Sequence, residues 1–152
     1  MHLRRLERYL RPYIDYIVEC ADFDRFICVG QHEFVSTTEA RNDGKEPLKL
    51  VYNSVDRSLS LYSATIGKWL ETRASRLLLC QNIVGASKFE LLIGTNENYG
   101  IVLRTVRCWS NLYVFPDGRV EAFKDKATKF KFLPLKKYNK GSTRSYPSIL
   151  NT

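Results

Sequence analysis

The stretch Ser87-Lys88-Phe89-Glu90-Leu91 decides the fold, because it recurs twice along the chain. It returns as Thr128-Lys129-Phe130-Lys131-Phe132 and, more loosely, as Glu46-Pro47-Leu48-Lys49-Leu50. In each copy two apolar residues flank a charged one, which is the alternation of a half-buried β-strand. The first apolar residue of each copy lies 41 residues from the next: Leu48, Phe89 and Phe130. We therefore predict three repeated units in which these three side chains are buried at equivalent positions.

The strands before these copies correspond as well. In the second and third units, residues 60–63 match 102–105, residues 68–70 match 112–114, and residues 76–80 match 118–122. The first unit is shorter, with its apolar runs at 26–29, 33–35 and 48–50. Three units of about four short strands are typical of a β-trefoil, in which half of the strands close a barrel and half form hairpins that cap it. We predict an all-β chain that folds as a single β-trefoil of three ~41-residue, four-stranded repeats; a two-sheet sandwich and chance similarity are the alternatives.

Two segments flank the trefoil, which we expect over residues 24–137. Residues 1–23 are expected to hold a short amphipathic helix, because apolar residues alternate at spacings of three and four; these are Leu3, Leu6, Leu10, Tyr13 and Ile17. Pro12 should distort or divide this helix. The helix would pack on the barrel, dock a partner helix or dimerise. Residues 138–152 are rich in Asn, Ser, Thr and Lys and are expected to form a flexible basic tail.

Composition favours one soluble domain. The chain has 152 residues, of which 44% are hydrophobic and 26% are charged, enough apolar surface for one core. No apolar run approaches the roughly 20 residues of a membrane-spanning helix, so no transmembrane segment is expected. Residues 1–23 mix Arg with Glu and Asp and do not resemble a classical secretion signal. We expect a cytoplasmic or unconventionally exported protein, with the compartment left open.

The sequence contains no motif of a known catalytic or metal site. The four cysteines are widely spaced and form no CxxC pair, which favours reduced thiols and argues against zinc: Cys20, Cys28, Cys80 and Cys108. His32 beside Glu33 has no positioned partner that would make it a general base. The nucleophile-elbow, P-loop and dinucleotide-binding motifs are absent from the sequence. We therefore predict a non-enzymatic binding protein that needs no cofactor.

The positive charge is concentrated near the C-terminus. Residues 119–144 carry nine basic and two acidic residues, so this segment supplies +7 of the net +8. Such a segment attracts polyanions, although a solubilising tail is the alternative. Alternation on a strand points Lys129 and Lys131 away from the apolar face of Phe130 and Phe132. We predict a polyanion-binding patch of Lys124, Lys126, Lys129, Lys131, Lys136 and Lys137. Nucleic acid ranks lower as a partner, because few aromatic residues stand nearby for base stacking.

Several short motifs resemble those of the fibroblast growth factors and, more loosely, their interleukin-1-like relatives. Arg25-Phe26-Ile27-Cys28 is similar to the family's opening strand, and Phe132-Leu133-Pro134-Leu135 to its closing strand. Phe89-Glu90-Leu91-Leu92, followed by Asn98-Tyr99, is similar to its receptor-contacting stretch. The resemblance implies a growth-factor-like ligand that binds a heparin-like sulfated glycan through its lysine patch. It also implies that the partner contacts are made by Glu90, Asn98 and Tyr99.

The sequence departs from that family and also resembles another. Ser87 stands where the growth factors usually have cysteine, and the basic loop before Phe132 is shorter. Gly67-Lys68-Trp69-Leu70 and Asp117-Gly118-Arg119-Val120 are similar to fascin-type trefoils, which bundle actin. That resemblance implies an intracellular scaffold module on actin or another cytoskeletal filament. Both resemblances agree on the fold and differ in the partner.

Overall fold

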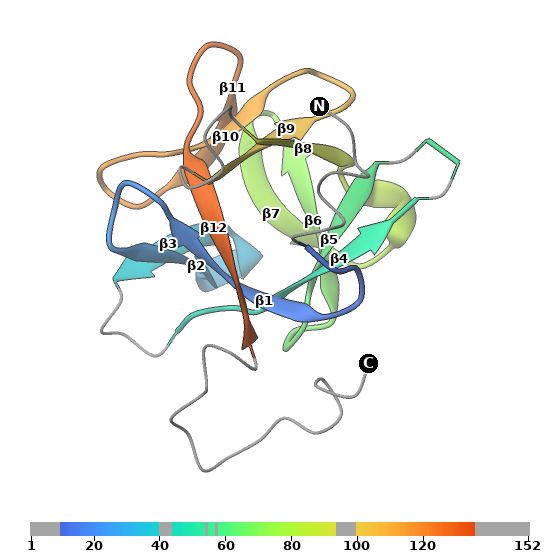
Figure 1. Ribbon diagram of the computed structural model, residues 1–152, viewed down its shortest axis with the longest axis horizontal. Coiled ribbons are helices and arrows are strands. Elements are labelled where there is room, and N and C mark those ends of the chain that lie inside the picture. The colour runs from blue at the N-terminus through green and yellow to red at the C-terminus, as the bar shows by residue number, and fades with distance from the viewer. Residues whose placement is uncertain (1–9, 40–43, 54, 57, 94–99, 136–152) are drawn as a thin grey trace.

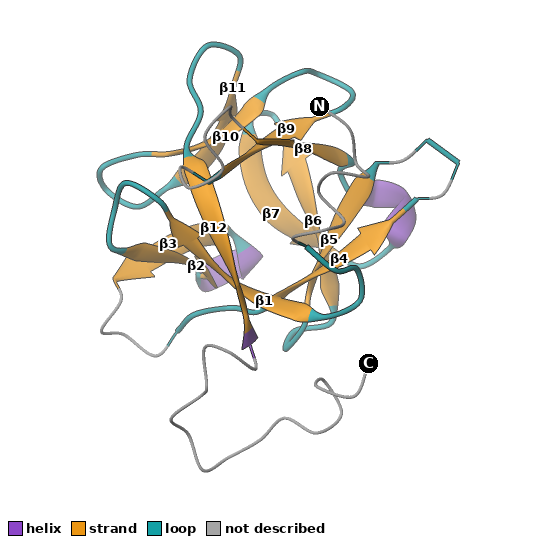
Figure 2. Ribbon diagram, in the orientation of Figure 1, coloured by secondary structure: helices purple, strands orange, loops and turns teal. Residues whose placement is uncertain are grey.

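The computed structural model describes residues 10–39, 44–53, 55–56, 58–93 and 100–135 (Figure 1). Strands and loops make up nearly all of this part of the chain, with two short 3-10 turns, η1 (Gln31–Glu33) and η2 (Ile83–Gly85), and one helical residue, Leu135, after the last strand (Figure 2). The twelve strands are β1 (Asp15–Cys20), β2 (Arg25–Val29), β3 (Val35–Glu39), β4 (Leu48–Tyr52), β5 (Leu59–Ser63), β6 (Lys68–Arg73), β7 (Arg76–Cys80), β8 (Phe89–Ile93), β9 (Ile101–Thr105), β10 (Asn111–Val114), β11 (Val120–Phe123) and β12 (Lys129–Pro134).

Six of these strands close a barrel. Strand β1 pairs with β4 and with β12, and the pairs β4–β5, β5–β8, β8–β9 and β9–β12 complete the ring, all antiparallel. Figure 1 shows β12 beside β1, where the two ends of the barrel sequence meet. Closure leaves the barrel without a free edge strand, which removes the template that an open array of short strands would present for aggregation.

The other six strands form three hairpins that cap the barrel: β2–β3, β6–β7 and β10–β11. Single bridges join the hairpins to one another in a triangle, namely Phe34 with Leu78, Arg76 with Glu121, and Ser36 with Arg119. Phe34, Arg76 and Arg119 occupy equivalent positions in the three hairpins, and so do Ser36, Leu78 and Glu121. Each bridge therefore joins the same two positions of neighbouring hairpins. Six barrel strands and three capping hairpins make the fold a β-trefoil, and the predicted fold class is confirmed.

The predicted core positions are confirmed as well. Leu48, Phe89 and Phe130 are each no more than 1% exposed, and each pairs with an apolar residue on a neighbouring barrel strand. Those partners are Tyr16, Leu59 and Ile101. The three pairs form one layer of the barrel core, because equivalent strands bring equivalent residues to the same height.

The helix expected near the N-terminus is wrong in the described residues. Asp15–Cys20 is strand β1, and residues 10–14 are not helical. The spacing of apolar residues did not distinguish a helix from a strand, because both faces of this strand are covered. Val18 faces the barrel core, while Ile17 packs with Phe26 and Leu135. The ring needs this strand between β4 and β12, and its β-branched residues favour the extended conformation. The trefoil therefore begins at β1, upstream of residue 24; residues 1–9 and the predicted tail at 138–152 lie outside the described residues.

Two of the predicted repeat matches are out of register. The match of residues 68–70 to 112–114 is off by two, because Trp69 pairs with Tyr62 as Asn111 pairs with Arg104, so residues 68–70 are equivalent to 110–112. The match of residues 76–80 to 118–122 is off by one. The cap bridges make Arg76 equivalent to Arg119, whereas matching residues 76–80 to 118–122 places Arg76 opposite Gly118. Because side chains alternate along a strand, a shift of one exchanges the buried and exposed faces. In the structure the buried residues coincide: Leu77 corresponds to Val120.

Candidate functional site

A row of polar and aromatic side chains crosses four strands on the outer surface: β8, the last strand of the second repeat, and β9, β10 and β11 of the third. Cross-strand pairing aligns Glu90 with Arg104, Arg104 with Asn111, and Asn111 with Phe123. These side chains are half-buried, while Leu103 and Leu112, their neighbours in sequence, point into the core. The alternation of the strands thus leaves one surface, which we call the third-repeat face, available for contact with another molecule.

Trp109 extends this face at the turn between β9 and β10. Its side chain is 60% exposed, although a ring of this size usually contributes to a core or an interface. The backbone is held in the left-handed region at φ 56°, with the Trp109 amide donating to the Thr105 carbonyl at 2.9 Å. In the second repeat the same turn places Gly67 at φ 80°, with its amide donating to Ser63. In this left-handed conformation a tryptophan lowers the stability of the fold by roughly 1–2 kcal/mol relative to a glycine, so the turn itself does not favour tryptophan at this position.

Arg104 positions the Trp109 ring. The guanidinium carbon lies 4.3 Å from the indole centroid, which is cation–π distance. Glu90 in turn holds the guanidinium, accepting from Arg104 Nε at 2.7 Å and from Arg104 Nη2. All three groups are partly in contact with solvent. The indole is therefore oriented before any ligand arrives, with the polar groups of Arg104 and Glu90 beside it. The ring can stack against the apolar face of a ligand, while the guanidinium and the carboxylate hydrogen-bond to the hydroxyls of that ligand.

Three further aromatic rings continue the face along the β10–β11 hairpin. Tyr113, Phe115 and Phe123 meet edge to face, with centroid separations of 5.2, 5.5 and 5.8 Å. Lys126 lies 5.5 Å from the Tyr113 centroid, and Arg119 lies 4.2 Å from that of Phe115. A cation lies over a ring face here, as Arg104 lies over Trp109, but these three rings are half-buried, so this half of the face is more closed to stacking than the exposed Trp109 is.

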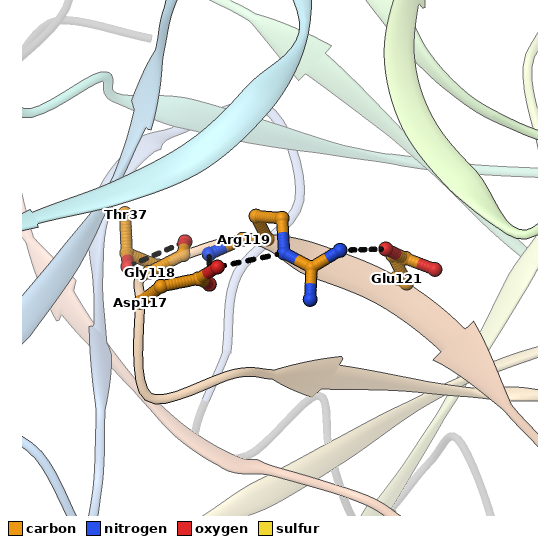
Figure 3. A network of polar contacts seen from close by, with 5 residues as sticks. All are labelled: Thr37, Asp117, Gly118, Arg119 and Glu121. Atoms are coloured by element: carbon orange, nitrogen blue, oxygen red, sulfur yellow. Dashed lines mark hydrogen bonds and ion pairs between the residues drawn. The ribbon is translucent and has the colours of Figure 1, made fainter.

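The tip of the same hairpin is anchored to β3 through Gly118 (Figure 3). The Gly118 carbonyl accepts from the Thr37 amide at 2.9 Å and from the Thr37 hydroxyl at 2.8 Å. Arg119 donates to Asp117 at 2.9 Å and to Glu121 at 3.0 Å. The hairpin is therefore fixed at its tip, and the cation of Arg119 is already balanced by two carboxylates.

The structure places four of the six predicted lysines on the surface. Lys124, Lys126, Lys129 and Lys131 are exposed, and Phe130 and Phe132 are buried as expected. Lys126 lies over the aromatic rings, whereas Lys131 pairs in register with Glu19 on β1. Lys136 and Lys137 lie outside the described residues, so a single polyanion patch stays a prediction.

Of the three predicted partner contacts, Glu90 is described and belongs to the third-repeat face. Its carboxylate is engaged with Arg104. Asn98 and Tyr99 lie outside the described residues. The role of all three residues in binding a receptor stays a prediction.

The cysteines and acidic residues of the described part of the chain form no group that could hold a metal ion. All four cysteines are free thiols, and burial raises the pKa of Cys20 to about 12. A thiol with that pKa stays protonated and unreactive at neutral pH. Within the described residues, no helix is long and apolar enough to cross a bilayer.

Comparison with known proteins identifies the fold in other chains. The structure is similar to that of the Rhizoctonia solani agglutinin, with a TM-score of 0.66 and 11% identity over 82% of this chain and 97% of the agglutinin. It is also similar to part of a GlcNAcα1-4Gal-releasing endo-β-galactosidase from Clostridium perfringens, with a TM-score of 0.67 and 10% identity over 80% of this chain and 32% of the enzyme. No family model and no curated protein sequence matches the chain. At these identities the likeness establishes a shared fold only.

Sequence reasoning missed Trp109 and Arg104. A position-by-position comparison of the repeats would have identified the tryptophan, because it stands in a turn where the second repeat has Gly67. Arg104 carries no such signal. Its contact with Trp109 and its pairing with Glu90 arise only when β8, β9 and the following turn come together.

Proposed function

We propose that the protein is a carbohydrate-binding, lectin-like β-trefoil that holds a saccharide against Trp109. The observation that carries the proposal is the exposed indole ring, which stands on a left-handed turn and has the Arg104 guanidinium carbon 4.3 Å from its centroid. A pyranose ring has an apolar face of C–H groups edged by hydroxyls. The indole complements the apolar C–H face, and the polar groups of Glu90, Arg104 and Asn111 beside it complement the hydroxyls.

The structural comparisons support this class of ligand. The agglutinin shares the fold over nearly its whole length, and the galactosidase shares it over a third of its length. Neither likeness supports a growth-factor receptor or a cytoskeletal filament as the partner, and both of those functions remain predictions from the sequence motifs. The expectation that the chain is not an enzyme also remains a prediction.

Balanced charge on the third-repeat face favours stacking and hydrogen bonding over a polyanion. Arg104 is paired with Glu90, and Arg119 is paired with Asp117 and Glu121. Paired cations release few counterions on binding, so they contribute little salt-dependent affinity. A neutral glycan therefore fits this face better than a sulfated one.

The proposal is tested by applying the folded protein to a printed array of neutral and sulfated glycans. The ligands found are then titrated against the wild type and Trp109→Ala. We expect selective binding of neutral glycans and a loss of at least about tenfold in affinity for Trp109→Ala, since the ring supplies most of the apolar contact. Phe23→Ala is the matched control, because Phe23 is an exposed aromatic residue in the corresponding turn of the first repeat. Equal binding by the wild type and Trp109→Ala would exclude this site.

A further inference from the structure

A crevice of about 450 Å³ lies between the second and third repeats, and its lining runs to Cys108, the residue before Trp109. Its lining comes from Glu71 and Thr72 on β6, from residues 84–88, and from residues 105–108. The last of these segments is the turn that ends at Trp109, so the crevice and the exposed indole are built on the same five-residue segment. The volume falls within the range of small-molecule sites.

Hydrogen bonds hold both walls of the crevice in place. The Val106 amide donates to the Lys88 carbonyl at 2.9 Å and joins the two walls. Ser87 accepts from the Thr72 amide at 2.7 Å, and the hydroxyls of the same two residues lie 2.9 Å apart. Lys88 is itself tied to Asp56 at 2.9 Å. A crevice with fixed walls does not have to be ordered by its ligand, which lowers the entropic cost of binding.

The lining alternates between apolar and polar groups. Val84 is 93% exposed and Val106 is also exposed, although valine is usually buried. Beside them stand the carboxylate of Glu71 and the guanidinium of Arg107. Glu71 accepts from Arg73 at 2.8 Å, whereas Arg107 forms neither an ion pair nor a hydrogen bond with another residue in the described part of the chain, so its donors are available. Apolar C–H faces edged by hydroxyls are the surfaces of sugar rings, and this lining complements them.

We propose that the crevice is a second subsite, which binds the next sugars of the chain whose first ring stacks on Trp109. The inference rests on the proposed carbohydrate-binding function and deepens it: the ligand is an oligosaccharide, not a single terminal sugar. The first ring is held at the exposed indole, and the adjoining rings lie between Val84 and Val106. Affinity then rises with the length of the saccharide until the crevice is filled.

The test compares short and long members of four saccharide series by isothermal titration calorimetry. The probes are galactose, glucose, mannose and N-acetylglucosamine, each beside its own β1,4-linked tetrasaccharide. In the series that binds, we expect the wild type to prefer the tetrasaccharide by at least about tenfold. Val84→Arg should reduce this ratio to near one and leave monosaccharide affinity unchanged, because a long side chain at this position blocks the crevice and not the indole. Trp109→Ala should weaken both ligands.

Val55→Arg is the matched control, since Val55 is 92% exposed and lies outside the crevice. It should retain the wild-type ratio, and equal melting temperatures should show that the variants are folded. Equal affinity for the monosaccharide and the tetrasaccharide, or an unchanged ratio in Val84→Arg, would overturn the second subsite while the carbohydrate-binding function stands. Binding of none of the eight probes, together with no neutral glycan on the printed array, would overturn both.

Discussion

The Arg104 guanidinium carbon lies 4.3 Å from the centre of the Trp109 indole ring, while its nitrogens are held by Glu90 on the neighbouring strand. The arginine therefore has one side against a carboxylate and one face against an aromatic ring. This arrangement limits the rotation of the indole although most of it is in solvent. A ring that is already oriented loses less side-chain entropy when a ligand stacks on it.

Arg104→Ala is expected to weaken glycan binding by about fivefold to tenfold, because it releases the Trp109 ring without removing it. Titration calorimetry measures the affinity, and the fluorescence anisotropy of Trp109 in a Trp69→Phe background should fall as the ring gains motion. Arg76→Ala is the control, since Arg76 stacks on Phe34 at 4.0 Å in the cap. If anisotropy and affinity are unchanged in Arg104→Ala, the arginine does not position the ring.

Gly118→Ala is expected to destabilise the fold by about 1–3 kcal/mol. Gly118 has φ 98°, and an added Cβ would overlap the Arg25 guanidinium and lie 3.2 Å from the Thr37 hydroxyl oxygen. The substitution therefore combines backbone strain with crowding of Arg25 and Thr37 at the hairpin's anchor on β3. Urea denaturation measures the change in the free energy of unfolding. Gly44→Ala should be nearly neutral, because among the described residues its new Cβ meets no heavy atom within 4 Å beyond its own chain neighbours.

Asp15→Asn is expected to stabilise the protein at pH 7 and to have a smaller effect near pH 4. Asp15 is 2% exposed, and Lys49 Nζ lies 3.9 Å from its carboxylate. Neither carboxylate oxygen has a hydrogen-bond partner among the described residues. Burial raises the pKa of Asp15, with the charge of Glu46 adding to the rise and Lys49 opposing it. A raised folded-state pKa favours the folded protein at acid pH, and this contribution is lost as pH rises through that pKa. Asparagine imitates the protonated acid, so its advantage should appear on the neutral side.

Asp56→Asn serves as the comparison, because the pKa of Asp56 is shifted in the opposite direction to that of Asp15. Hydrogen bonds from Ser58 and Lys88 lower the pKa of Asp56, so this carboxylate contributes stability above its ordinary pKa and loses it in acid. Urea denaturation of both variants from pH 3 to 8 measures the two dependences. A stability difference between wild type and Asp15→Asn that does not vary with pH would contradict the assignment of a raised pKa to Asp15.

The lysine patch predicts retention on immobilised heparin that weakens as salt rises. The double variant Lys129→Glu and Lys131→Glu should elute at markedly lower salt, because both side chains are exposed on β12. Arg73→Glu and Lys88→Glu together change the same number of exposed cations on the second repeat and should matter less. Retention of the wild type that is independent of these lysines, or no retention at low salt, would show that the segment only aids solubility.

The sequence alone was sufficient for the architecture. The spacing of Leu48, Phe89 and Phe130 and the charged residue between apolar neighbours were enough to predict three units, a closed barrel and the three buried positions. Both signals can be read along the chain. The period between repeats and the alternation along a strand each reflect which side chains must leave water. They failed at β1, where burial on both faces hides the alternation. They also failed by two residues at β10 and by one at β11, where side-chain types repeat loosely.

Only the tertiary structure decided the third-repeat face. Glu90, Arg104 and Trp109 are distributed over two strands and a turn, and antiparallel pairing of β8 with β9 is what sets the carboxylate beside the guanidinium. The crevice likewise needs the turn at 105–108 to meet the segment at 84–88 through the Val106–Lys88 hydrogen bond. The sequence was enough to locate the lysine-rich segment, because the charges of a segment can be summed without knowing its structure. A binding surface depends on distances between residues remote in sequence, and those distances exist only once the barrel has closed.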